Sequence, residues 1–154
     1  MNCLSFKTKF GWISAFEKKN RIVRLKFAKH KSKSVSENLK KVKSQISNFL
    51  NNKNKKISIK LQVDGNSIQK KVWRDLAKIK FGETKSYGQI AKKYKLSPRH
   101  VGKICGQNKI VLAIPCHRVI RSDGSIGGFS SAGGKKLKKQ LLDFEKKSFI
   151  SKFK

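Results

Sequence analysis

The spacing of apolar residues changes along the chain, and this change sets the fold class. Up to residue 27 apolar and polar side chains alternate, which is typical of half-buried strands. One such run covers residues 11–16 and another covers 21–27, with a hairpin turn expected at residues 18–20. The residues expected on one face of the second run are Val23, Leu25 and Phe27. Farther along, apolar residues recur every three or four positions, which is typical of helices. The sequence therefore predicts an α+β protein.

Serine residues mark where the first helices should begin. A helix is expected over residues 34–50, with Ser34 or Ser36 as its N-cap. Its expected core-facing residues are Val35, Leu39, Val42, Ile46 and Phe49 or Leu50. A second helix is expected over residues 67–79. Polar residues interrupt the pattern at 51–56 and again at 64–66. We therefore expect an α+β lobe over residues 1–62 and a mostly helical domain over 63–154.

The second half contains two helices joined by a short turn. Ser86 and Gln89 have the spacing of a capping box, which opens a helix that runs to Tyr94. Ser97 is a natural N-cap for the next helix, since Pro98 at the first helical position needs no N–H partner. Glycines at 124, 127 and 128 then interrupt the pattern before a last helix expected over residues 134–147.

The helix that follows Ser97 has two contrasting faces. At 100° per residue, one side carries the apolar residues Val101, Ile104 and Cys105. The other side carries Arg99, Gly102, Lys103 and Gly106. A small, positive face lets a helix backbone approach a phosphate chain closely. The alternative is a solvated face with incidental glycines.

The charge of the chain points toward polyanions without identifying one. Its 39 Lys and Arg residues against 8 Asp and Glu residues give a formal net charge of +31. Such a field attracts nucleic acid and releases counterions on binding. Only six of the basic residues are Arg, however, and a genome rich in A and T would produce the same lysine excess without selection for binding. Charge alone makes a nucleic-acid partner plausible and proves nothing.

Several classes of protein are not expected. No apolar run reaches the roughly 18 residues of a membrane span, and the N-terminal residues lack the pattern of a signal peptide. The odd set of three cysteines suggests reduced thiols. Neither a Cys-x-x-Cys pair nor a histidine cluster indicates a metal site. We expect a cytoplasmic protein without metal.

The adjacent residues Cys116 and His117 are the strongest candidate for chemistry. An apolar segment, residues 111–114, leads to the thiol. A thiol is a nucleophile only as thiolate, so it needs a base or a positive environment. Neighbouring side chains in an extended segment point opposite ways, which makes a bridging water the easier geometry. The plain alternative is a buried structural cysteine beside a surface histidine.

The segment around this pair resembles a known family. Pro115-Cys116-His117-Arg118-Val119 is similar to the signature of the O6-alkylguanine-DNA alkyltransferases, which are suicide DNA-repair methyltransferases. The resemblance covers about residues 66–147. Its other motifs are Val72-Trp73, Phe81-Gly82-Glu83-Thr84, Ser86-Tyr87, Arg99-His100-Val101-Gly102, Asn108, Gly127-Gly128-Phe129-Ser130 and Leu141-Leu142-Asp143-Phe144-Glu145.

The resemblance implies a fold and a reaction. The fold would be a small ribonuclease H-like α/β lobe followed by a helical domain with a winged helix-turn-helix. Glu145, acting through His117 and a water, would remove the proton from Cys116, while Asn108 holds the turn that presents the thiol. The thiolate would take the alkyl group in one displacement as Tyr87 protonates the leaving guanine. This reaction needs no cofactor.

The resemblance also implies a partner, double-stranded DNA that contains O6-alkylguanine and possibly O4-alkylthymine. The damaged nucleotide would be flipped out, and Arg99 would fill the gap. The residues implied to contact DNA are Tyr87, Arg99, Gly102, Lys103 and Gly106. Those implied to line the substrate pocket are Val119, Gly127, Gly128, Phe129 and Ser130. We expect a monomer.

Some positions depart from the family's pattern. Lys109 replaces a common proline after the asparagine, and Phe129 stands where tyrosine is common. The loop over residues 130–134 is about two residues longer than usual, which leaves the shape of the pocket open. Cys105 occupies a pocket-wall position, and we interpret it as a packing thiol.

Two other functions remain as alternatives. One is a DNA-binding protein of the same fold that recognises lesions without chemistry. The combination of Cys116, His117, Asn108 and Glu145 argues against it. The other is a cysteine hydrolase, which lacks a recognisable oxyanion arrangement here and leaves the basic helix pair unexplained.

Overall fold

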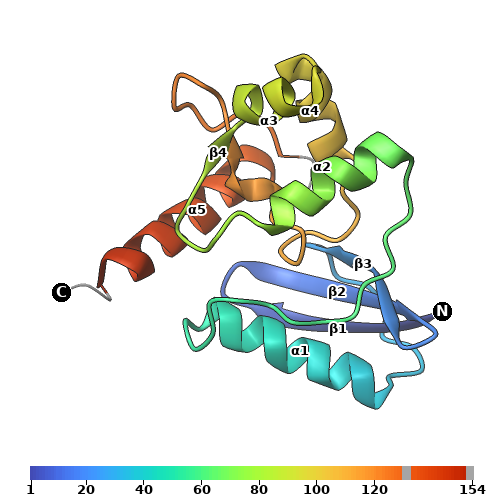
Figure 1. Cartoon of the computed structure of the whole chain (residues 1–154). Helices are drawn as coiled ribbons and strands as arrows, with labels where there is room; N and C mark the ends of the chain where they lie inside the picture. The colour runs from blue at the N-terminus through green and yellow to red at the C-terminus, as the bar shows by residue number, and fades with distance from the viewer. Residues whose placement is uncertain (130–132, 152–154) are drawn as a thin grey trace. The chain divides into compact units, whose positions relative to one another are not determined.

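The chain forms two compact units in the computed structural model, which describes residues 1–129 and 133–151, with side chains described up to residue 148. The first unit contains residues 1–63 and a short segment, 109–113, from the second half of the chain. The second unit contains residues 64–108 and the chain from residue 114 onward. The expected mixture of strands and helices is confirmed (Figure 1).

The first unit is a three-stranded antiparallel sheet with one helix packed on it. The strands β1 (Asn2–Thr8), β2 (Gly11–Lys18) and β3 (Arg21–Lys26) are joined in sequence order. The helix α1 (Glu37–Leu50) covers one face of this sheet, as Figure 1 shows. The predicted turn between β2 and β3 is confirmed: Lys19 and Asn20 both have positive φ, the conformation of a two-residue hairpin turn that follows the strand twist.

The predicted shared face of Val23, Leu25 and Phe27 is wrong at its first residue. The pairing of β2 with β3 shifts between Phe16 and Glu17, which oppose Arg24 and Ile22. Val23 is therefore the extra residue of a bulge, and the alternation reverses before it. As a result, Ile22 is fully buried and Val23 is only half-buried.

Of the two candidate caps of α1, Ser36 is the N-cap. Its side chain accepts a hydrogen bond from the Leu39 amide at 3.1 Å and donates one to the buried Glu17 carboxylate at 2.8 Å. Because the helix begins after Ser36, Val35 lies outside it and is 39% exposed, so its predicted place in the core is wrong. The other predicted residues of the core face are buried: Leu39, Val42, Ile46, Phe49 and Leu50.

The short segment 109–113 joins the first unit through β3. The amide of Leu25 donates to the carbonyl of Lys109 at 3.0 Å, and the amide of Val111 donates to the carbonyl of Leu25 at 3.3 Å. The chain thus leaves the second unit after Asn108 and returns to it at Ile114.

In the second unit, the described residues form four helices and one short parallel strand pair. The helices are α2 (Ser67–Ala77), α3 (Tyr87–Tyr94), α4 (Pro98–Gly106) and α5 (Gly134–Ser151). The strands β4 (Lys85–Ser86) and β5 (Val119–Ile120) pair in parallel, and a single 3₁₀ turn, η1 (Cys116–Arg118), precedes β5. The last helix begins where predicted and extends past the expected end at residue 147. None of the described helices has the length and apolar character needed to cross a bilayer.

Side-chain caps set the starts of the helices in this unit. The capping box of Ser86 and Gln89 is present at α3, and Ser97 caps α4 with Pro98 at its first position, as predicted. Asn66 and Gln69 form a further capping box at α2. The sequence pattern predicts only a polar interruption at residues 64–66 and no cap there. Helix α4 buries Val101, Ile104 and Cys105, which confirms its predicted inner face. The indole N–H of Trp73 donates to the carbonyl of Ile104 at 3.0 Å and fixes α4 against α2.

Substitution of the α4 cap tests its contribution to stability. Ser97→Ala removes the hydrogen bond to the His100 amide, so we expect the free energy of unfolding to fall by about 1 kcal/mol. Urea denaturation would measure this change. Gln140→Ala, at an exposed position within α5, is the control and should change the free energy by less than about 0.5 kcal/mol. Equal effects of the two substitutions would contradict a capping role for Ser97.

Candidate active site

Cys116 is the first residue of a tight turn and is almost fully buried, with 4% of the residue exposed. The Cys116 amide donates to the carbonyl of Ile114 at 2.8 Å, and the Arg118 amide donates to the carbonyl of Pro115 at 3.0 Å. These short-range bonds define the backbone on both sides of the thiol. The turn therefore fixes the thiol and places His117 and Arg118 in the residues that follow it.

Asn108 lies beside this turn, at the point where the chain leaves the unit. Its side-chain amide donates to the carbonyl of Ile114 at 2.8 Å. This hydrogen bond joins the residues at which the chain leaves the second unit and returns to it. Its side chain also forms a hydrogen bond with Cys116. Asn108 is thus in position both to hold the turn and to stabilise negative charge on the thiol.

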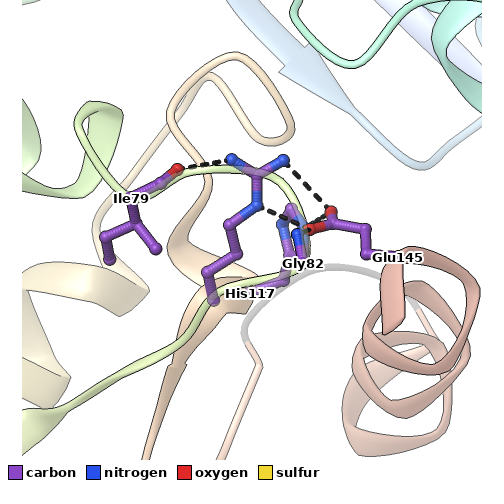
Figure 2. Close-up of polar contacts among 5 residues, drawn as sticks. Ile79, Gly82, His117 and Glu145 are labelled. Carbon is purple, nitrogen blue, oxygen red and sulfur yellow. Dashed lines mark hydrogen bonds and ion pairs between the residues drawn. The ribbon is translucent and has the colours of Figure 1, made fainter. Parts of the chain in front are cut away.

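A buried carboxylate connects α5 to the turn. Glu145 Oε2 contacts His117 Nε2 at 2.5 Å, and the guanidinium of Arg118 donates to both carboxylate oxygens, at 2.7 and 3.2 Å. Figure 2 shows these contacts together with Ile79 and Gly82. The Ile79 carbonyl accepts from Arg118 at 2.7 Å, and the Gly82 amide donates to Glu145 at 3.3 Å. Every charge in this cluster has a partner.

The electrostatics of the cluster favour a neutral histidine beside an ionised carboxylate. Burial alone would raise the pKa of Glu145, but hydrogen bonds and charge from His117 and Arg118 outweigh it and lower the pKa to about 2. Burial lowers the pKa of His117, against the opposing effect of Glu145. A neutral His117 donates its Nε2–H to Glu145, which leaves the lone pair on Nδ1. Nδ1 is buried and has no hydrogen-bond partner among the described residues, so its lone pair can accept a proton.

A second buried cation, Lys138, lies near the thiol. Lys138 in α5 is only 1% exposed, and its ammonium group donates to the Val119 carbonyl at 2.6 Å, the Tyr87 hydroxyl at 3.1 Å and the Gly128 carbonyl at 3.2 Å. Burial lowers the pKa of Lys138 to about 8, although the nearby thiols oppose this shift. Burial likewise raises the pKa of Cys116, while Asn108 and the charge of Lys138 lower it. Burial therefore keeps the thiol protonated, while Asn108 and Lys138 each stabilise the thiolate form.

Tyr87 is placed to donate a proton. Because Lys138 donates to its hydroxyl oxygen, the phenolic hydrogen is left to point elsewhere. Burial raises the pKa of Tyr87 to about 12, so the hydroxyl stays protonated. Gly127 makes room for the ring: it has φ +76°, and a Cβ there would lie 3.0 Å from the tyrosine ring.

A cavity of about 700 Å³ opens onto Cys116. This size is within the usual range for small-molecule sites. Besides Cys116, seven of the residues predicted to contact substrate or DNA line it: Tyr87, Arg99, Gly102, Gly106, Gly127, Gly128 and Phe129. Cys105, interpreted as a packing thiol, is buried and also lines the cavity.

Two of the residues predicted to contact DNA or substrate do not line the cavity, and a third is not among the described residues. Lys103 is exposed on α4 and does not line the cavity. Val119 is fully buried and contributes its backbone carbonyl to Lys138 in place of a side-chain contact. Ser130 lies outside the described residues, as does most of the longer loop. Within the described part of the chain, no group of three His, Cys, Asp or Glu residues is arranged to hold a metal ion.

Sequence reasoning missed Arg118 and Lys138 as members of the site. Arg118 has no predicted role beyond its place in the motif, although its position directly after His117 indicates that it lies close to the site. Lys138 is one of 39 basic residues, so composition gave no reason to select it. Its spacing did contain a signal, because residues 138 and 145 share one face of a helix and Glu145 is a predicted catalytic residue.

The Glu145 cluster predicts a pH-dependent contribution to stability. The pKa of Glu145 falls from 4.5 to about 2, so its stabilising effect is complete above pH 4.5 and is lost as the pH falls toward 2. Glu145→Gln should lower the free energy of unfolding by about 3 kcal/mol at pH 7, since it leaves Arg118 buried without its partner.

Urea denaturation at several pH values should show the difference between wild type and Glu145→Gln shrinking below about pH 4.5. Asp143→Asn is the control, because Asp143 lies in the same helix but its ion pair with Lys139 is exposed. A difference that stays constant down to pH 2.5 would show that Glu145 is not an ionised partner in the folded protein.

Comparison with known proteins identifies the family. The family model for the 6-O-methylguanine DNA methyltransferase DNA-binding domain matches residues 67–147. A Metallosphaera sedula protein named methylated-DNA--protein-cysteine methyltransferase is 33% identical over 92% of this chain and 90% of its own length. The inducible methyltransferase of that name from Bacillus subtilis is 37% identical over 68% of this chain, a match that spans 58% of the relative.

The solved structures agree with these sequence matches. A Mycobacterium tuberculosis structure, described as OGT in complex with DNA, has a TM-score of 0.85 and 26% sequence identity, with 96% of this chain and 94% of that chain covered. The family model spans more than half of the chain, and the Metallosphaera sedula relative is matched over nearly its full length. The chain therefore belongs to the 6-O-methylguanine DNA methyltransferase family.

Proposed function

We propose that this protein repairs DNA by moving the alkyl group of O6-alkylguanine onto its own Cys116, once and irreversibly. The observation that carries the proposal is a buried thiol on the wall of a cavity, next to a neutral histidine that Glu145 and Arg118 hold in place. The names of the relatives support methyl transfer from DNA to a protein cysteine.

The reaction begins with removal of the thiol proton. A water between Cys116 and His117 Nδ1 passes the proton to the imidazole, and Glu145 stabilises the imidazolium that forms. Asn108 and Lys138 stabilise the thiolate at the same time. Arg118 keeps Glu145 ionised throughout, so the cluster accepts a proton without leaving an unpaired buried charge.

The thiolate then displaces guanine from the alkyl carbon. A carbon–sulfur bond forms as the carbon–oxygen bond to O6 breaks, and the leaving guanine takes a proton from the Tyr87 hydroxyl. Lys138 can return a proton to Tyr87, because its pKa of about 8 is well below the value of about 12 for the tyrosine. The product is a thioether and the reaction uses no cofactor, so each molecule acts once.

The DNA-binding part of the proposal concerns α4 and its surroundings. The damaged nucleotide leaves the duplex and enters the cavity, and Arg99 fills the gap in the base stack. Gly102 and Gly106 lie on the cavity wall and allow close approach of the DNA backbone, while the exposed Lys103 contacts phosphate. Gly127, Gly128 and Phe129, with Ser130 from outside the described residues, enclose the base.

The finer structural expectations belong to the same proposal. We infer that residues 1–62 form a ribonuclease H-like lobe and that residues 63–154 form the alkyltransferase domain, with α3 and α4 as a winged helix-turn-helix. We also infer a monomer that acts on double-stranded DNA in the cytoplasm. The paired helices α3 and α4 support the helix-turn-helix part of this inference.

Intact mass after reaction tests the proposal. With a duplex that contains one O6-methylguanine, the wild type should gain one methyl group per molecule, located at Cys116 by peptide mapping. Cys116→Ala should gain nothing, whereas the control Cys3→Ala, altered in the other unit, should gain one methyl group. Binding without any mass change would favour a lesion-recognising protein, and turnover without a covalent product would favour a hydrolase.

A further inference from the structure

Arg121 lines the cavity that contains Cys116, and the proposed mechanism gives it no role. Arg121 follows β5 and opens a tight turn. Its amide donates to the Ser125 carbonyl at 2.9 Å, and the Gly124 amide donates to the Arg121 carbonyl at 2.9 Å. The backbone is therefore fixed at the edge of the cavity, while the residue itself is exposed.

The guanidinium of Arg121 is available to a ligand. Among the described residues it forms no hydrogen bond and no ion pair. The nearby carboxylate of Asp123 accepts at Oδ1 from the Ser125 amide at 2.9 Å and from the Ser125 hydroxyl at 2.7 Å. These hydrogen bonds, and to a smaller degree the charge of Arg121, lower the pKa of Asp123, but the two side chains form no ion pair. An exposed arginine with free donors is suited to bind an oxyanion in a bidentate manner.

The charge of Arg121 also reaches into the cavity. It lowers the pKa of Tyr87 and of Lys138, although burial has a larger effect on both groups. Among the described residues that line the cavity, the charged ones are Arg99 and Arg121, and none is a carboxylate. The cavity thus has two cations among its lining residues, and a third, Lys138, donates to the lining residues Tyr87 and Gly128.

We propose that Arg121 binds a backbone phosphate next to the flipped nucleotide and so positions the alkylguanine against Cys116. This inference rests on the proposed function. A nucleotide whose base fills the cavity must carry its own phosphates at the cavity edge, where Arg121 is exposed. The alternative anion is a negatively charged alkyl group on the base itself. Such a group would lie deeper in the cavity, beside Lys138, whose donors are already used by Tyr87, Val119 and Gly128. Arg121 is thus a positioning residue for DNA.

The test compares Arg121→Gln with Arg74→Gln, which removes the same charge from an exposed position in α2. Single-turnover transfer is measured on a duplex that contains O6-methylguanine and on free O6-methylguanine base. Arg121→Gln should slow the duplex reaction about tenfold, since one charged hydrogen-bonded contact is lost, and slow the free-base reaction much less. Arg74→Gln should follow the wild type on both substrates.

Neutral methylphosphonates, placed one at a time on either side of the lesion, locate the contact. At one position the substitution should slow the wild type about tenfold and slow Arg121→Gln little further, because both changes remove one interaction. Equal slowing of both proteins at every position would overturn the inference, as would equal losses of Arg121→Gln on duplex and free base. If the wild type gains no methyl group from either substrate, the proposed function fails and this inference fails with it.

Discussion

The rest of the site depends on the contacts that the ionised carboxylate of Glu145 makes. It joins α5 to the turn after Cys116 by binding His117 and Arg118 together, and it is buried with both of them. A buried carboxylate is costly without partners. Arg118 supplies the compensating charge, so His117 can remain neutral and keep a lone pair on Nδ1. One ion pair therefore serves both the packing of the unit and the proposed chemistry.

The same reasoning explains why α5 carries a second buried charge. A thiolate at Cys116 would be unfavourable in a dry site, and Lys138 and Asn108 are the groups that offset this. Lys138 and Glu145 are seven residues apart, so both project from one face of α5. Lys138 reaches the Val119 carbonyl, and Glu145 reaches His117 and Arg118. The helix thus supplies the cation that favours the thiolate and the anion that favours the protonated base.

Several local features were predicted correctly from the sequence, whereas features that depend on distant residues were not. The caps at Ser86 and Ser97 and the hairpin turn at residues 18–20 depend on neighbouring residues, and each was predicted. The bulge at Val23 depends on pairing with another strand, so alternation alone misplaced that residue. Lys138 looked like any other surface lysine, because its burial follows from groups far away in the sequence. Cys116 and His117 were predicted because they are adjacent in the sequence and lie in a motif that resembles a family signature, whereas Arg121 was recognised only from the cavity that it lines.

The protonation of His117 is the most direct test of this account. Nitrogen NMR of histidine-labelled protein, assigned with a His117→Gln variant, distinguishes a neutral ring from a charged one and one tautomer from the other. We expect a neutral ring at pH 7 with the proton on Nε2, facing Glu145, and no proton on Nδ1. A doubly protonated ring, or a neutral ring with its proton on Nδ1, would contradict the account, because His117 would then have no lone pair with which to accept the proton of Cys116.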